Sequence, residues 1–212
     1  MDREDRDKVR ALGSSLELTT APTVEPLTLE EVRDHLRLTT TDDDAYLDAL
    51  IVGVRQAFEK TYDLALLTQT RKLRLDRGWP ERIFLPHRPV QSVSSIAYLD
   101  PDGVSQTLAS SVYQVVGART TPDVDTPACY VTLAYNQSWP SIRIVPETIT
   151  VTYVCGWLGR GSIPQPIRQA MLVAIAQLYE WRESTVDVGI NDLPTIENLM
   201  ADYRGYREYR YD

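Results

Sequence analysis

Residues 41–67 read TDDDAYLDALIVGVRQAFEKTYDLALL, and this stretch decides the fold. Its apolar residues recur at steps of three and four, which places them on one face of an α-helix from about Asp42 to Tyr62. The residues predicted to pack in a core from this face are Leu47, Leu50, Ile51, Val54 and Phe58. Thr41 or Asp42 can cap the helix, and the acidic run lies where the positive helix end favours negative charge. The apolar face needs a partner.

A second amphipathic helix is predicted from Pro166 to about Arg182, where the sequence reads PIRQAMLVAIAQLYEWR. Pro166 suits a first helical position, because the missing amide has no helical partner there. The core-packing residues predicted on this helix are Ile167, Met171, Leu178 and Trp181. A shorter helix is predicted earlier, at LTLEEVRDHLRL, where Thr28 and Glu31 have the spacing of a capping box.

The region between the two long helices has the pattern of short strands separated by proline and glycine turns. Residues 149–154, for example, read ITVTYV and alternate between two faces. No helix-length crossover is present to support parallel pairing, so the strands should be antiparallel. The sequence therefore predicts an α+β fold: a small helical bundle with an inserted antiparallel β-sheet or sandwich subdomain. The predicted divisions are a mobile N-terminal arm (1–23), a first segment of the helical core (24–67), the β subdomain (68–155), a second segment of the helical core (156–202) and a C-terminal tail (203–212).

The composition is that of an ordinary globular protein, with 43% hydrophobic and 25% charged residues. A formal net charge of −8 argues against a dedicated nucleic-acid binder, which normally presents a basic face. The sequence has neither an apolar run near membrane-spanning length nor a secretion signal, so we expect no membrane span and use in the cytoplasm. Two cysteines, Cys129 and Cys155, favour free thiols in strands, and a disulfide stays open.

The local motifs favour structural interpretations over chemical ones. Asp42, Asp43 and Asp44 lack the alternation and glycine of a calcium loop, so helix capping is the better interpretation. GWLGRGS at 156–162 lacks the lysine of a phosphate-binding loop and is predicted to be a turn. No nucleophile or metal constellation is recognisable, and the histidines, His35 and His87, have no ligand spacing to a suitable partner. We predict no enzyme activity, no metal and no cofactor.

Aromatic residues gather in two settings. The four tryptophans, Trp79, Trp139, Trp157 and Trp181, are expected to pack in cores or interfaces, although a ligand groove is the alternative. The C-terminal tail interleaves tyrosine with arginine, the residue types that most often carry interface energy. Its candidate interface residues are Tyr203, Arg204, Tyr206, Arg207, Tyr209, Arg210 and Tyr211.

The order and spacing of several pieces resemble the head-tail connector (adaptor) proteins of long-tailed bacteriophages and gene transfer agents. The pieces are LTLEEVRDHLRL, DDDAYLDALIVGVRQAFE, LTQT, WP with IFLPHRPVQSVSSIAYLDPDG, ITVTYVCGW, PQPIRQAMLVAIAQLYEWRE, and LP with ENLMADYR. The resemblance covers about Leu27 to Arg204, and the chain departs from it mainly in its charged arm and Tyr/Arg tail.

This resemblance implies a non-catalytic protein of the virion head-tail junction, assembled in the bacterial host cytoplasm. It implies a ring, of twelve subunits, between the portal protein and a tail-side stopper or head-completion protein, with DNA passing through without specific binding. The tail is then the expected portal-binding segment. The alternative, from a different class, is a small ligand- or glycan-binding β module on a helical stalk.

Overall fold

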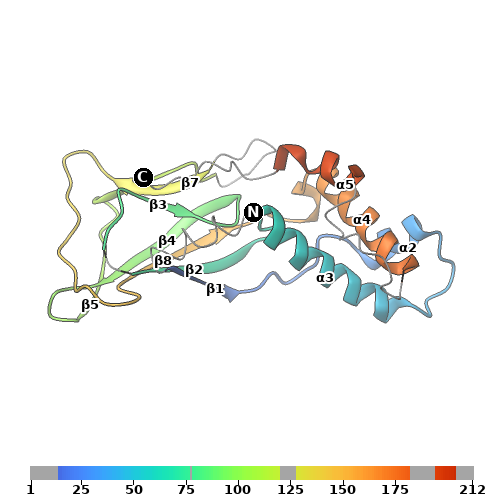
Figure 1. Cartoon of the computed structure of the whole chain (residues 1–212), viewed down its shortest axis with the longest axis horizontal. Helices are drawn as coiled ribbons and strands as arrows, with labels where there is room; N and C mark the ends of the chain where they lie inside the picture. Colours follow the sequence, from blue (N-terminus) through green and yellow to red (C-terminus); the bar gives the residue numbers. More distant parts are fainter. Residues whose placement is uncertain (1–13, 77, 120–127, 182–193, 204–212) are drawn as a thin grey trace. The chain divides into compact units, whose positions relative to one another are not determined.

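The computed structural model describes residues 14–76, 78–119, 128–181 and 194–203 (Figure 1). Helices and antiparallel sheets together make an α+β fold, as the sequence predicts. The chain divides into two compact units. The β unit holds the described residues of Met1–Pro22 and Thr68–Gly156, and the helical unit holds those of Thr23–Leu67 and Trp157–Asp212.

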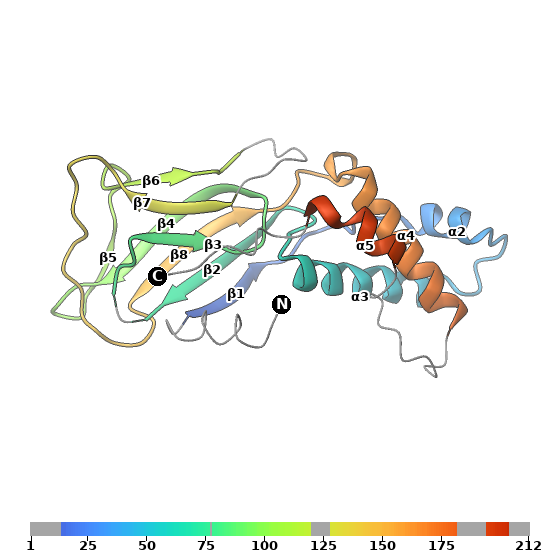
Figure 2. The same ribbon diagram turned by 45° about the horizontal axis from the view of Figure 1, so that its top comes forward.

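Two antiparallel sheets build the β unit. The strands are β1 (Ser14–Thr20), β2 (Gln69–Leu75), β3 (Arg82–Leu85), β4 (Val90–Leu99), β5 (Ser105–Thr107), β6 (Tyr113–Val116), β7 (Cys129–Leu133) and β8 (Ile149–Cys155). The larger sheet has the order β1-β2-β8-β4-β5, and the smaller one has the order β3-β7-β6. Figures 1 and 2 show the smaller sheet as a second layer beside one face of the larger sheet.

Strand β8 lies in the middle of the larger sheet and follows the predicted alternation. Ile149, Val151, Tyr153 and Cys155 are buried, whereas the threonines between them are less so. The Tyr153 hydroxyl donates a hydrogen bond of 2.9 Å to the carbonyl of Pro86, which follows β3. Cys129 in β7 and Cys155 are both buried free thiols, which confirms the thiol interpretation.

The N-terminal arm prediction is wrong for residues 14–20, because these residues form strand β1. The sequence SSLELTT alternates Leu16 and Leu18 with polar residues, and this short pattern is typical of a half-buried strand. Residues 1–13 of the predicted arm lie outside the described residues. Among the described strands, β1 pairs with β2 alone, so tertiary pairing decides its conformation.

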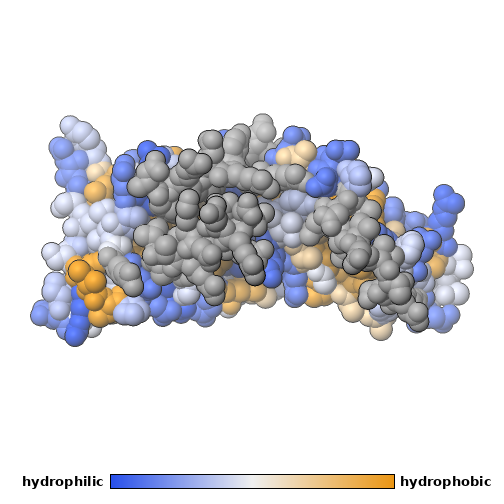
Figure 3. All heavy atoms as spheres, viewed as in Figure 1, coloured by the Kyte–Doolittle hydropathy of each residue, from blue (hydrophilic) through white to orange (hydrophobic). Residues whose placement is uncertain are grey.

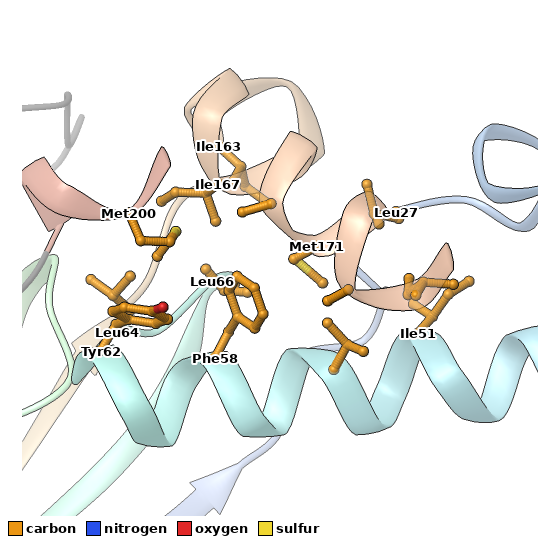
Figure 4. Close-up of a cluster of buried hydrophobic side chains, with 14 of the residues drawn as sticks. Leu27, Ile51, Phe58, Tyr62, Leu64, Leu66, Ile163, Ile167, Met171 and Met200 are labelled. Carbon is orange, nitrogen blue, oxygen red and sulfur yellow. The ribbon is translucent and has the colours of Figure 1, made fainter. Parts of the chain in front are cut away.

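The helical unit contains α2 (Leu29–Leu36), α3 (Asp44–Tyr62), η1 (Arg160–Ser162), α4 (Gln165–Glu180), α5 (Pro194–Leu199) and η3 (Ala201–Tyr203). Helix α3 packs against α4, and the other helices close around the same apolar cluster. Figure 4 shows Phe58 of α3 pointing toward the chain segments that carry Leu66, Ile163 and Ile167. The core therefore joins residues from both sides of the β region in the sequence.

The N-terminal cap of α2 is the predicted one, whereas the N-terminal cap of α3 differs from the prediction. Thr28 and Glu31 form the predicted capping box, with the Thr28 hydroxyl accepting from the Glu31 amide at 3.2 Å. The predicted cap of α3 at Thr41 or Asp42 is wrong, because Asp43 occupies the N-cap position without a side-chain capping bond. Instead, the Asp43 carboxylate accepts a hydrogen bond of 2.5 Å from the hydroxyl of Tyr179 on α4. A tertiary contact has replaced the local cap.

The glycine-rich stretch before α4 is a turn, as predicted. Residues Arg160–Ser162 form one turn of 3-10 helix, and Pro164 is the N-cap residue of α4. Pro166 is the second helical residue, one position later than predicted.

Candidate functional site

No group of three or more His, Cys, Asp or Glu residues that could hold a metal ion is found in the portion of the chain that the structure describes. Among the described helices, none combines the length and the apolar character that a membrane crossing requires. The notable features of the described residues are a largely buried charged network, an aromatic loop and several exposed apolar residues.

A charged network fixes the segment that leads into α2. The Arg55 guanidinium on α3 donates to both carboxylate oxygens of Glu25, at 2.7 and 3.3 Å, and to Glu59 at 3.2 Å. The second oxygen of Glu59 accepts from the backbone amide of Leu66 at 2.9 Å. Arg55 and Glu59 are both buried, although their sequence positions lie off the apolar face of the helix. Their burial is possible because each charge is paired.

A second pair of arginines extends this network to α4. Arg160 donates to the backbone carbonyl of Glu25 at 2.7 Å, and Arg168 donates to the carbonyl of Arg160 at 2.9 Å. Arg168 also pairs with the carboxylate of Glu31 in the capping box. The network thereby joins α2, α3, η1 and α4 through the loop at Glu25.

The electrostatics of the network favour its charged forms. Burial alone would lower the pKa of Arg55, but hydrogen bonds and negative charge from Glu25, and then from Glu59, raise it above its usual value. Burial likewise opposes the charge on Glu31, yet the Thr28 amide and the Arg168 cation outweigh it and lower the pKa of Glu31.

The aromatic loop lies in the β unit, between β7 and β8. The Trp139 ring stacks on Trp79 with centroids 4.5 Å apart, and Tyr98 meets Trp79 edge-on at 5.8 Å. The Trp79 indole donates to the carbonyl of Pro140 at 3.0 Å. This stacking holds a segment without regular structure against β4. Tyr135 near the start of that segment is exposed.

Most of the predicted core residues are buried in the helical unit. The structure buries Leu47, Ile51, Val54, Phe58, Ile167 and Met171 and packs Leu50 and Leu178 partly buried against the same cluster. The prediction is wrong for Trp181, whose side chain is 54% exposed. Helix α4 ends at Glu180, so Trp181 leaves the helical phase that would have carried it to the apolar face. Trp157, in contrast, is buried.

The tail prediction needs one correction. Tyr203 is only 5% exposed and belongs to the apolar cluster of the helical unit, so it is not a freely presented interface residue. The other tail residues, Arg204, Tyr206, Arg207, Tyr209, Arg210 and Tyr211, lie outside the described residues.

The β unit also exposes apolar residues that no motif in the sequence singles out. Leu16 and Leu18 on β1, Val104 before β5 and Ile144 before β8 are all exposed. Of these four residues, only Leu16 and Leu18 have a local sequence pattern, the alternation with polar residues that is typical of a strand. The exposure of Val104 and Ile144 depends on how the loop before β5 and the loop before β8 pack, which the sequence does not show.

The described residues thus offer a buried charged network, a stacked aromatic loop and exposed apolar side chains, and none of these features by itself assigns a function. Residues 26–121 match the family model of the phage gp6-like head-tail connector protein. No curated protein sequence matches the chain.

Solved structures of gene transfer agent (GTA) particles are similar along nearly the whole chain, covering 91% of it and 96% of the matched chains. A chain of the native GTA virion has 25% identity and a TM-score of 0.71. Chains from the neck of the empty particle, computed with C6 symmetry, and of the native particle, computed with C12 symmetry, have 24% and 23% identity and TM-scores of 0.73 and 0.65. The family match over residues 26–121 and the similarity to the GTA particle chains together support a head-tail connector family and a structural role for this chain.

Proposed function

We propose that the chain forms a ring beneath the portal protein, joins the capsid to the tail and lets DNA pass. The observation that carries this proposal is the similarity, over 91% of the chain, to a neck protein whose structure was computed with C12 symmetry. The ring would have twelve copies, with the portal on one side and a stopper or head-completion protein on the other. It would act at the virion head-tail junction after assembly in the host cytoplasm, without catalysis or a cofactor.

The net charge of −8 supports a channel through which DNA moves without specific binding. A basic lumen would hold DNA by counterion release and resist its movement, so the lumen of the ring should be acidic or neutral. In this proposal the described helices act as a small bundle, and the two sheets act as a sandwich-like lobe that is built from strand β1 and from the segment inserted at residues 68–155.

Residues 204–212 are the proposed portal-binding tail. Tyr203 is buried among the same apolar residues as Met200 and Phe58, so the segment that follows it leaves from a fixed point. Its tyrosines would fill pockets, and its arginines would pair with carboxylates of the portal.

Two truncations test the tail and separate binding from folding. A chain that ends at Tyr203 should keep the thermal transition of the full chain and lose portal binding in a pull-down with purified portal. A chain that ends at Asp202 should also unfold at a lower temperature, because a buried aromatic side chain is removed. Undiminished portal binding by the chain ending at Tyr203 would show that the docking surface lies elsewhere.

Native mass spectrometry tests the ring itself. We expect the free protein to be mainly monomeric at micromolar concentration and to form a twelve-copy assembly when purified portal is added. A monomer that binds glycans and never assembles on portal would favour the ligand-binding alternative. A stable ring formed without portal would contradict the expectation that ring formation requires the portal protein.

A further inference from the structure

Exposed apolar residues lie on one edge strand of the larger sheet and in two loops near its other edge strand. Strand β1 forms one edge and β5 the other. On the β1 edge, Leu16 is 36% and Leu18 is 44% exposed. Beside the β5 edge, Val104 is 55% and Ile144 is 76% exposed. We call these pairs the β1 patch (Leu16 and Leu18) and the β5 patch (Val104 and Ile144).

The β1 patch is the uncovered end of a row that is buried elsewhere in the sheet. The strand register places four residues side by side on one face, in the order Ile96, Val151, Leu73 and Leu16. The first two are fully buried, and Leu73 is 5% exposed. The apolar face thus continues beyond the region that the described residues cover, and Leu16 is exposed.

The polar face of β1 is already engaged within the chain. Glu17 pairs with Arg74 at 2.5 Å, and the Ser15 hydroxyl donates to Glu147 at 3.1 Å. Alternation along the strand places these residues on the face opposite to Leu16 and Leu18. A slip of one residue would break both contacts and reverse both faces, so the leucines are held in their exposed position.

The β5 patch is carried by two loops that support each other. The Arg143 amide donates to the carbonyl of Leu99 at 3.1 Å, and the Val104 amide donates to the carboxylate of Asp100 at 2.9 Å. Gly103, at φ +86°, lies so close to the Arg143 side chain that a Cβ there would come within 2.5 Å of it. Figure 3 shows hydrophobic residues gathered at this end of the β unit.

We propose that the β1 patch of one copy packs against the β5 patch of the next copy in the ring. This inference rests on the ring of the proposed function. A closed ring needs a head-to-tail contact between two different surfaces of the same subunit. The two patches meet that need, because both are apolar and they lie in different places: the β1 patch is on one edge strand, and the β5 patch is in the loops before β5 and β8. Each patch has only two residues, so the contact between two free copies should be weak. This fits a ring that forms only when the copies are gathered on the portal protein.

Cross-linking of the full chain tests the contact directly. Leu16→Cys and Val104→Cys are made singly and together, and the proteins are treated at high concentration with a flexible bismaleimide. The native thiols, Cys129 and Cys155, are buried and should not react in the folded protein. The control pairs Leu16→Cys with Val24→Cys, because Val24 is as exposed as Leu18 but lies in the helical unit.

A head-to-tail contact predicts a specific pattern on a denaturing gel. The double variant should give a ladder of covalent oligomers, an equal mixture of the two single variants should give dimers and nothing larger, and each single variant alone should stay monomeric. The control pair should also stay monomeric. Dimers from Leu16→Cys alone would show a symmetric contact and overturn the proposal. So would a double variant without a ladder, the result expected if residues 1–13 or another protein cover the β1 patch.

Charged variants separate this inference from the proposed function. Leu16→Asp with Leu18→Asp, and Val104→Asp with Ile144→Asp, should each keep the thermal transition, because the changed side chains are exposed. Both should fail to form rings on purified portal under conditions in which the unchanged protein forms them. Normal rings from either variant would overturn the edge contact and leave the ring function standing. Failure of the unchanged protein to form rings would count against the proposed function, and the cross-linking pattern would still decide the edge contact.

Discussion

The helical unit and the β unit use the same charged residue types in different ways. In the helical unit, Arg55 and Glu59 form an ion pair that is buried beside the apolar cluster. In the β unit, Arg74 pairs with Glu17 and Glu147 at the surface of the larger sheet. A buried pair is costly to break because the remaining charge stays without its partner, whereas an exposed charge regains water. The comparison shows that the location of an ion pair, and not its presence, sets its importance for stability.

The largest effect is expected in the apolar core of the helical unit. Phe58→Ala removes a fully buried ring from α3 and should lower the free energy of unfolding by about 3–5 kcal/mol. Ile96→Ala is the matched change in the β unit and should cost about 2–5 kcal/mol. Urea unfolding followed by far-UV circular dichroism measures both. A cost near zero for Phe58→Ala would contradict the packing of α3 against α4.

The ion pairs should give the clearest difference between the units. Arg55→Ala leaves the Glu59 carboxylate buried with one partner fewer and should cost about 3 kcal/mol. Arg74→Ala removes an exposed pair and should cost less than about 1 kcal/mol. Chemical denaturation at one ionic strength compares the two. Equal costs would refute the distinction between buried and exposed pairs.

Acid should weaken the helical unit through Glu31. Because its pKa is lowered in the folded protein, the carboxylate contributes stability above its ordinary pKa of 4.5, and this contribution is lost as the pH falls below 4.5 toward the folded value. The contribution should be below about 1 kcal/mol, because the carboxylate is partly exposed. Glu31→Gln should therefore lose stability against the unchanged protein near neutral pH, and the difference should shrink in acid. A difference that does not vary with pH would show that the charge of Glu31 is not responsible.

Cysteine labelling can report the opening of the β unit separately from that of the helical unit, because both cysteines lie in the β unit. Burial raises the pKa of Cys129 to about 12, so this thiol should react with iodoacetamide only when the β unit opens. Labelling should therefore be faster in Ile96→Ala than in the unchanged protein, and little changed in Phe58→Ala. Equal acceleration in both variants would show that the two units unfold together.

Local patterns in the sequence predicted much of the fold. The three- and four-residue spacing of Leu47, Ile51 and Phe58 predicts α3, and the alternation of residues 149–154 predicts β8. The capping box of Thr28 and Glu31 is also local, since both partners lie within one helical turn. These features were predictable because each depends on residues close together in the chain.

The candidate site was less predictable, because exposure depends on which surfaces meet. Periodicity placed Trp181 in the core, but α4 ends one residue before it. The interleaved tyrosines and arginines placed Tyr203 in a free tail, but its ring packs in the cluster with Met200.

The sequence by itself determined which residues form helices and strands, that the strands pair antiparallel, and which helix faces are apolar. Only the tertiary structure decided that Arg55 and Glu59 are buried, because their partners Glu25 and Leu66 come from segments outside the helix. It also decided that Leu16 and Leu18 are exposed, because the row of apolar residues across the larger sheet extends one strand beyond the region that the described residues bury. The physical reason is the same in both cases. A local pattern fixes the direction of a side chain, and the burial of that side chain depends on what distant segments place in front of it.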